Sequence, residues 1–372
     1  MRILFSCRPA YGHLFPLVPL ARALRHAGHE VVFATGQAFV GKAEELGFET
    51  YPCGISIAEA EVEARRRHGD EDVARLLITM FADLVPRATV ADLGSLLPRI
   101  RPDLVVYEQS DAGAAKAARD AGIPFVSHVI GRSMPPELQR LAAPEMAWLW
   151  DGGPAPADLM LGDTAVDLWP DVVRDPVVAA LPTVLRLRPT SFDLDVPMPA
   201  VDPAKPLVYL TLGTVAFRAT EVLRDAVDGL SRLPVQVLVA VGPGDPAVLG
   251  AVPPNVRVAG FVPQAKVVRQ ADLVVHHGGT GTVLGALAAG LPQLALPQGA
   301  DQFVNADALV ASGTGEKLAG DEVSADAVAE AAGRLLRDES TRDTARKARD
   351  EIAAMPDPTA VAEELIALVK GF

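Results

Sequence analysis

Apolar and polar positions in the first half of the chain follow two patterns. Short apolar runs, which predict buried strands, cover residues 2–7, 30–34, 48–51, 103–107 and 124–128. Between the first two runs, apolar side chains recur every three or four positions, at Leu14, Leu17, Val18, Ala21 and Leu24. This spacing predicts a helix over residues 14–27 that Gly28 ends, and a second helix is expected to end near Gly47. Strands that alternate with helices predict a doubly wound parallel sheet.

A second series of the same kind begins at residue 207. Its predicted strands are residues 207–212, 235–241, 256–260, 273–276 and 293–296. Two helical segments follow within residues 324–354, and a last one covers residues 359–370. The predicted fold class is therefore α/β with two doubly wound domains. Residues 55–100 and 130–185 are less regular and carry many charges, prolines and tryptophans.

Prolines separate the two series. They fall at Pro189, Pro197, Pro199, Pro203 and Pro206. Because proline lacks a backbone N–H and fixes φ, this stretch cannot be a regular helix or a central strand. We interpret residues 189–206 as a linker between an amino-terminal domain, residues 1–188, and a carboxy-terminal domain, residues 207–354. Residues 355–372 then form a separate terminal segment.

The glycine-rich stretch HHGGTGT, residues 276–282, lies between a predicted strand and a helical pattern over residues 283–289. Glycines let the backbone approach a ligand closely, and free N–H groups at a helix N-terminus attract anions. Two histidines and two threonine hydroxyls add hydrogen-bond donors. The stretch therefore indicates a phosphate site, although a tight turn without a ligand has the same composition.

A second motif, PQGADQFVN at residues 297–305, also follows an apolar run and opens a helical pattern. Ligands of parallel sheets bind at the carboxyl ends of the strands, so both motifs are expected at one crevice. Asp301 and Gln302 offer an adjacent acceptor and donor, which suit the hydroxyls of a sugar. The alternative is that Asp301 only caps a helix.

These two motifs, with FVPQ at residues 261–264 and GHLFP at residues 12–16, resemble the inverting, nucleotide-sugar-dependent glycosyltransferases of GT-B fold. The similarity is greatest to the actinobacterial branch that glycosylates natural products, and it covers nearly the whole chain. It implies two Rossmann-like domains facing a cleft, with residues 355–372 packing back on the amino-terminal domain. It also implies that residues 55–100 and 130–185 shape the acceptor pocket.

His13 is the candidate general base, because histidine titrates near neutrality and this one follows the first strand. The alternative is a helix-capping or otherwise satisfied histidine. A carboxylate should orient His13, and the resemblance assigns this role to Glu108, with Asp111 as the second candidate. Better-known relatives carry aspartate at the first of these positions, so Glu108 is a departure. Both carboxylates could instead belong to a solvated loop.

The resemblance places the diphosphate of the nucleotide sugar on residues 277–282. His277 aligns with the phosphate-contacting histidine of the family, whereas His276 aligns with a variable residue before it. The backbone N–H groups of Gly281 and Thr282 and the Thr282 hydroxyl are expected to contact the remaining oxygens. The other glycines of this predicted site are Gly278 and Gly279.

Gly213 and Thr214, after the strand at 207–212, are a second expected phosphate contact, although they could simply end that strand. Phe261 is expected to stack on the base, in place of the tryptophan of many relatives, with the Val262 backbone at the edge of the ring and Gln264 completing the motif.

Asp301 and Gln302 are expected to bind the sugar, with help from Asn305. The phenylalanine favours a thymidine diphosphate (TDP) deoxysugar, with a uridine diphosphate (UDP) sugar as the alternative.

Composition excludes several classes of function. With 372 residues and 49% hydrophobic content, the chain can form two cores, and its net charge of −13 argues against nucleic acid or an anionic membrane as partner. Two cysteines, Cys7 and Cys53, do not make a disulfide framework, and no apolar run is long enough to span a bilayer. We therefore expect a cytoplasmic monomer or homodimer that acts on small molecules.

No cofactor or metal ion is expected. The pair Asp193 and Asp195 has the spacing of a metal motif found in other glycosyltransferases, but it lies in the proline-rich linker without a preceding strand. The favoured function is thus metal-independent, inverting transfer of a sugar to a hydroxyl of a small, largely apolar aglycone. A nucleotide-sugar epimerase or hydrolase and a non-catalytic auxiliary partner of another glycosyltransferase remain alternatives. A dinucleotide oxidoreductase is disfavoured because residues 8–13 lack the G-x-G-x-x-G fingerprint.

Overall fold

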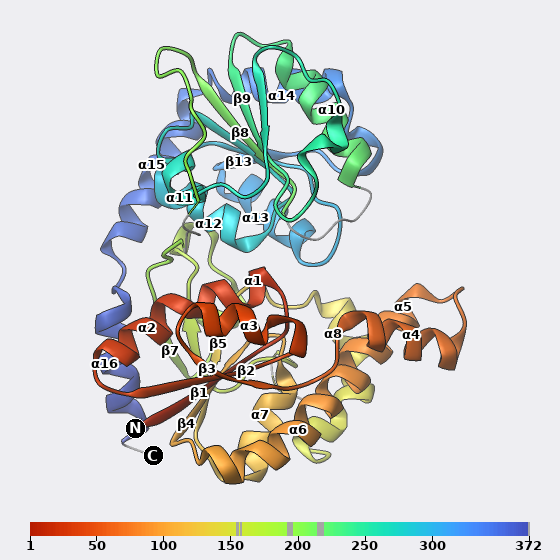
Figure 1. Cartoon of the computed structure of the whole chain (residues 1–372), viewed down its shortest axis with the longest axis vertical. Coiled ribbons are helices and arrows are strands. Elements are labelled where there is room, and N and C mark those ends of the chain that lie inside the picture. Colours follow the sequence, from red (N-terminus) through yellow and green to blue (C-terminus); the bar gives the residue numbers. More distant parts are fainter. Residues whose placement is uncertain (154–155, 157, 192–195, 214–218, 371–372) are drawn as a thin grey trace. The chain divides into compact units, whose positions relative to one another are not determined.

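The computed structural model covers the chain and describes every residue except 154–155, 157, 192–195, 214–218 and 371–372. Its described residues fall into two units (Figure 1). The first comprises Met1–Leu168, Asp175–Leu187 and Pro356–Phe372, and the second comprises Trp169–Arg174 and Arg188–Met355. The segment Trp169–Arg174 joins the second unit because the backbone N–H groups of Asp171 and Val172 donate to Glu351.

The described strands of the first unit form one parallel sheet in the order β3-β2-β1-β4-β5-β6-β7. Their bounds are β1 Arg2–Cys7, β2 Glu30–Thr35, β3 Glu49–Pro52, β4 Leu104–Glu108, β5 Phe125–His128, β6 Thr164–Asp167 and β7 Thr183–Arg186. The order reverses between β1 and β4, as in dinucleotide-binding sheets. β1 and β4 are almost wholly buried, as expected for strands with helices on both faces.

The helices of the first unit connect these strands. Their bounds are α1 Tyr11–Leu14, α2 Val18–His26, α3 Gln37–Glu45, α4 Ile57–His68, α5 Val73–Ile78, α6 Val85–Ile100, α7 Ala112–Asp120, α8 Pro136–Met146, α9 Pro176–Ala179 and α16 Pro358–Val369. α16, from the end of the chain, packs on α2 (Figure 1). The core beside α6 and α7 includes Leu4, Val32, Val105 and Leu93.

Two predictions for this unit need correction. The helix predicted over residues 14–27 is divided into α1, a 3₁₀ turn over Phe15–Leu17 and α2, because Pro16 and Pro19 each remove a backbone N–H donor. The region 55–100, predicted as irregular, is largely helical and contains the long helix α6. Pro86 lies at the second position of α6, directly after a π-helical turn over Thr79–Leu84, and the chain stays helical through it.

The second unit repeats the architecture. Among the described residues its parallel sheet has the order β10-β9-β8-β11-β12-β13, with a reversal between β8 and β11. The strands are β8 Leu207–Thr211, β9 Gln236–Ala240, β10 Val256–Ala259, β11 Leu273–His276, β12 Gln293–Ala295 and β13 Gly315–Lys317. The helices are α10 Ala219–Ser231, α11 Gln264–Val268, α12 Thr280–Ala289, α13 Gln302–Ser312, α14 Ala325–Leu335 and α15 Glu339–Ala354.

Two parallel sheets, each with helices, confirm the predicted α/β class. The core of the second unit packs the sheet residues Val208, Val239 and Val275 against Leu230 of α10 and Leu335 of α14. None of the helices in the described part of the chain is both long enough and apolar enough to cross a membrane.

Candidate functional site

In each unit the candidate residues lie where the strand order reverses. Ligands of parallel sheets bind at such points, outside the carboxyl ends of the strands. In the first unit, β1 leads to His13 and β4 ends at Glu108. In the second unit, β8 leads to Gly213 and β11 leads to the glycine-rich turn. The topology therefore brings motifs that are distant in sequence to two sheet edges.

His13 and Glu108 form a hydrogen-bonded pair. His13 Nδ1 lies 2.9 Å from Glu108 Oε1, the His13 side chain is 24% exposed, and the Glu108 side chain is completely buried. A buried carboxylate accepts a hydrogen bond, so the proton of the neutral imidazole belongs on Nδ1. Nε2 then carries the free lone pair, which is the arrangement a general base requires.

Other groups around Glu108 favour its charged form. Ser110 donates its backbone N–H to Oε2 at 2.8 Å and its hydroxyl lies 2.7 Å from both carboxylate oxygens. The Nε of Arg8 lies 3.4 Å from Oε1. Burial alone opposes ionisation, but the charges and hydrogen bonds of His13, Arg8 and Ser110 hold the pKa of Glu108 well below its usual range.

Asp111 lies beside this pair but contacts a different group. Its Oδ2 accepts a hydrogen bond from the Ser6 hydroxyl at 2.6 Å, and its Oδ1 has no hydrogen-bond partner among the described residues. Burial and the neighbouring Glu108 charge raise the pKa of Asp111 to about 6. Of the two carboxylates predicted from the sequence, the structure thus places Glu108 on His13.

In the second unit, the ring of His277 lies between two glycines. A Cβ added at Gly213 would lie 2.5 Å from His277 Nε2, and one added at Gly279 would overlap the same atom. Gly213 also has φ +79°, which side chains other than glycine rarely adopt. Burial lowers the pKa of His277 to about 4, so its imidazole is neutral near pH 7.

The turn after His277 opens α12 without a side-chain cap. The N–H groups of Thr282 and Val283 donate to Gly279 O at 3.0 Å each. The Thr282 N–H, which is expected to contact the diphosphate, thus already donates within the first turn of the helix. Within the described residues, the N–H groups of Gly279, Thr280 and Gly281 at this helix start have no acceptor.

The FVPQ segment contacts this helix start. Val262 is buried, Phe261 is partly buried, and Gln264 begins α11. The Gln264 side chain donates to Gly281 O at 3.4 Å, and the Thr282 hydroxyl lies 3.5 Å from Gln264 Oε1. The structure thus brings together two of the motifs that the sequence separates.

The PQGADQFVN segment also contacts the start of α12, through Asp301. Asp301 Oδ2 accepts from the Thr280 hydroxyl at 3.3 Å and from Asn305 Nδ2 at 3.0 Å. Gln302 is buried, and its side-chain oxygen Oε1 accepts from the backbone N–H groups of Gln298 and Gly299 at 2.8 and 3.1 Å. Asp301 and Gln302, which are predicted to bind the sugar, therefore use some of their hydrogen bonds within the protein. Thr214, Asp193 and Asp195 lie outside the described residues.

Sequence reasoning missed three residues at these sites. Arg8 and Ser110 surround Glu108, and His276 contacts the glycine-rich turn through Gly278. The only available signals were their positions next to the motifs, which do not reveal a side-chain direction. Among the described residues, no group of three or more histidine, cysteine or acidic side chains could hold a metal ion.

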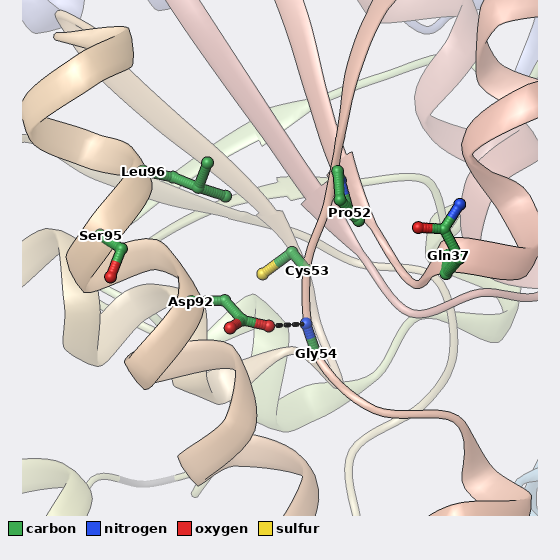
Figure 2. Close-up of a pocket in the computed structure, with 7 residues that line it drawn as sticks. All are labelled: Gln37, Pro52, Cys53, Gly54, Asp92, Ser95 and Leu96. Atoms are coloured by element: carbon green, nitrogen blue, oxygen red, sulfur yellow. Dashed lines mark hydrogen bonds between the residues drawn. The ribbon is translucent and has the colours of Figure 1, made fainter.

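A hollow of about 340 Å³ lies beside the edge strand β3, between α3 and α6 (Figure 2). Its lining includes Gln37, Cys53, Asp92 and Ser95, and none of its lining residues is hydrogen-bonded to His13 or Glu108. Burial raises the pKa of the Cys53 thiol, which excludes a reactive thiolate there.

Comparison with known proteins decides the family. Residues 224–368 match the family described as Erythromycin biosynthesis protein CIII-like, C-terminal domain. The chain is 33% identical to the L-demethylnoviosyl transferase of Streptomyces niveus, over 99% of this chain and 98% of that protein. The chain belongs to the glycosyltransferases of antibiotic biosynthesis. This glycosyltransferase is also 32% identical to the elloramycin glycosyltransferase ElmGT of Streptomyces olivaceus, over 98% and 97% of the two chains.

Solved structures place the glycosyltransferase in the GT-B fold. The glycosyltransferase SnogD from Streptomyces nogalater is similar with a TM-score of 0.79 at 28% identity, over 99% of both chains. SsfS6 from Streptomyces sp. SF2575, crystallised with thymidine diphosphate, has a TM-score of 0.80 at 26% identity, also over 99% of both chains. The predicted fold and family are therefore confirmed.

Proposed function

We propose that this glycosyltransferase moves a deoxysugar from TDP to a hydroxyl of a small, largely apolar natural-product aglycone. The transfer inverts the anomeric carbon, needs no metal ion and uses His13 as general base. The observation that carries the proposal is the 2.9 Å hydrogen bond between His13 Nδ1 and the buried Glu108 carboxylate. This bond leaves Nε2 of a partly exposed histidine available to take a proton.

The acceptor hydroxyl gives its proton to His13 Nε2 as its oxygen attacks the anomeric carbon. Glu108 accepts the hydrogen bond from Nδ1 and stabilises the imidazolium that forms. Attack from the face opposite the leaving group converts an α-linked nucleotide sugar to a β-linked product, with the mirror outcome for L-sugars. The electron pair of the broken C–O bond leaves with the diphosphate.

The leaving diphosphate is bound by neutral donors in the second unit. The developing charge is stabilised by the free N–H groups of Thr280 and Gly281 and by the ring of His277. A helix N-terminus can perform this task without a cation, which supports the proposed metal independence. Phe261 stacks on the base, and Asp301 and Gln302 contact the sugar.

Two observations support thymidine as the nucleoside. The aromatic residue before Val262 is phenylalanine, and a relative of the same fold, SsfS6, was crystallised with thymidine diphosphate. One relative is named an elloramycin glycosyltransferase and the matching family is named for erythromycin biosynthesis, which supports a natural-product aglycone. Calorimetric titration with TDP, UDP and GDP tests the nucleoside, since the proposal requires the tightest binding for TDP.

His13→Ala tests the base. We expect kcat to fall by about 100-fold or more, with the dissociation constant for TDP unchanged, because the change removes proton transfer and leaves the second unit intact. His26→Ala, at the exposed end of α2, is the matched control. Turnover of His13→Ala within about tenfold of the unaltered protein would refute the assignment.

Product analysis with the nucleotide sugar alone separates transfer from the other chemistries. A transferase leaves the nucleotide sugar intact until an acceptor is added. Free sugar would indicate a hydrolase, and an isomeric nucleotide sugar would indicate an epimerase.

A further inference from the structure

Gly278, in the glycine-rich turn, has its backbone N–H and its backbone carbonyl each hydrogen-bonded to a buried side chain. The N–H of Gly278 donates to His276 Nδ1 at 2.9 Å. The carbonyl of Gly278 accepts from Asn305 Nδ2 at 2.8 Å. The side chains of His276 and Asn305 have no exposed surface, so water does not compete for either bond.

His276 has a single tautomer that satisfies these contacts. Because the Gly278 N–H is a donor, Nδ1 must be an acceptor, and the proton belongs on Nε2. Nε2 lies 2.8 Å from Gln293 Oε1, which accepts that proton's hydrogen bond. Burial, followed by the neighbouring His277, lowers the pKa of His276 to about 3, and the ring therefore stays neutral near pH 7.

Gly278 also lies close to the backbone of α13, in a conformation that favours glycine. Its φ is +91°, and a Cβ there would lie 2.7 Å from Gln302 O. Gly278 is thus held by His276 at the end of β11 and by Asn305 in α13. Gln293, at the start of β12, holds His276 in turn.

The residues on either side of Gly278 are those proposed to bind the diphosphate. His277 precedes it, and the free N–H groups of Thr280 and Gly281 follow within one turn. A rotation of the Gly278 peptide would therefore turn both sets of donors together. Groups held in position before a ligand arrives bind it more tightly than groups that must be ordered by it.

We propose that His276 and Asn305 are positioning residues, which fix the Gly278 peptide so that His277 and the helix start are oriented toward the diphosphate of the nucleotide sugar. The inference rests on the proposed function, because it concerns the same diphosphate. Neither residue touches the ligand: His276 acts through Gly278, and Asn305 acts through Gly278, Thr280 and Asp301.

Substitutions at His276 test the inference through binding of TDP, measured by calorimetry on the full chain. His276→Phe fills the same space but leaves the Gly278 N–H without an acceptor, and we expect TDP to bind about tenfold more weakly or worse. His276→Asn keeps an oxygen near the position of Nδ1, and we expect TDP affinity within about threefold of the unaltered protein. Thermal unfolding of both variants records the effect on stability separately.

His128→Phe is the matched control. His128 is equally buried and ends β5 in the first unit, but its ring nitrogens have no hydrogen-bond partner among the described residues. We expect this change to alter the melting temperature and to leave the TDP dissociation constant within about twofold, because no contact links it to the turn.

A second variant keeps the inference testable if His276→Phe does not fold. Asn305→Leu is nearly isosteric and removes the donor to the Gly278 carbonyl, the Thr280 hydroxyl and Asp301, so we expect about tenfold weaker TDP binding here as well. If the unaltered protein binds no TDP, the proposed function fails. If it binds TDP and a folded His276→Phe or Asn305→Leu binds equally well, the positioning inference fails while the proposed function stands. Equal losses in His276→Asn and His276→Phe would also refute the acceptor role of Nδ1.

Discussion

At the end of β4, the carboxylate of Glu108 collects hydrogen bonds from His13, Ser110 and Arg8, while Asp111 accepts one from Ser6. The two buried carboxylates are close enough for the charge of one to raise the pKa of the other. Their environments therefore differ: cations and donors keep Glu108 ionised, whereas Asp111 retains its proton up to about pH 6.

Glu108→Gln and Asp111→Asn form a pair that tests these roles. Glu108→Gln removes the charge opposite the imidazolium, so we expect kcat to fall by about 100-fold or more with TDP affinity unchanged. Asp111→Asn resembles the protonated form and does not contact His13, so we expect kcat within about fivefold of the unaltered protein. Steady-state kinetics of both variants provide the measurement. The reverse ranking would make Asp111 the partner of His13.

The resemblance of the sequence to known glycosyltransferases predicted that an acidic residue, Glu108 or else Asp111, would orient His13. It did not determine which carboxylate faces the histidine. Glu108 and Asp111 are only three positions apart, and the answer depends on the side-chain directions at the start of α7. The two hydrogen bonds of His276 could not be predicted from the sequence either, because Gln293 and Gly278 belong to separate elements.

At the scale of elements, the turn after β8 and the turn after β11 pack a histidine ring between two glycines. Gly213 and Gly279 come from different turns, yet each leaves space for the same ring. The glycines in the motif are therefore explained by packing as well as by access of a ligand. The strand-turn-helix arrangement itself was predictable from the apolar runs, because each run is followed by glycine and then by a helical pattern.

Gly213→Ala tests this packing. The added Cβ would meet His277 Nε2, and the φ of +79° disfavours alanine, so we expect about tenfold weaker TDP binding and a lower melting temperature. Gly94→Ala is the control, because it lies in α6 with nothing near its Cβ, and alanine there should raise the melting temperature. Unchanged TDP binding in Gly213→Ala would separate this glycine from the site.

Other elements could not be predicted. Residues 79–84 form a π-helical turn between α5 and α6, and no composition rule distinguishes such a turn from a loop. The strands β6, β7 and β13, with the sequences TAVD, TVLR and GEK, lack the continuous apolar runs from which strands such as β4, β8 and β11 were predicted.

For the whole molecule, three buried histidines link stability to pH. Among the described residues, His128, His276 and His277 have pKa values lowered to about 4, 3 and 4 from 6.5, in each case chiefly by burial. Between these values and 6.5 the unfolded chain binds protons that the folded chain does not. Each histidine thus contributes stability that is present above pH 6.5 and is lost as the pH falls below it. Asp111 and Asp158 act with the opposite sign, because burial raises the folded pKa of each, but they are two groups against three.

We therefore expect the urea midpoint to change little from pH 7.5 to about 6.5 and to fall as the pH is lowered further to about 5. His276→Asn removes one of the three histidines, so the fall should be shallower in that variant. Equilibrium unfolding followed by tryptophan fluorescence at several pH values provides the measurement. A midpoint that is independent of pH over this range, or an unchanged slope in His276→Asn, would mean that these rings are not neutral in the folded state.

The membership of α16 determines how chimeras of this enzyme can be built. The His13–Glu108 pair lies entirely in the first unit, and the glycine-rich turn proposed to bind the diphosphate lies entirely in the second. The acceptor-side and donor-side residues can therefore be exchanged separately between relatives. However, the chain returns to the first unit after Met355, and α16 packs on α2. A hybrid joined only after Leu187 would give α2 a helix from another parent. Hybrids with a second crossover after Met355 keep that pair together and are the ones expected to fold.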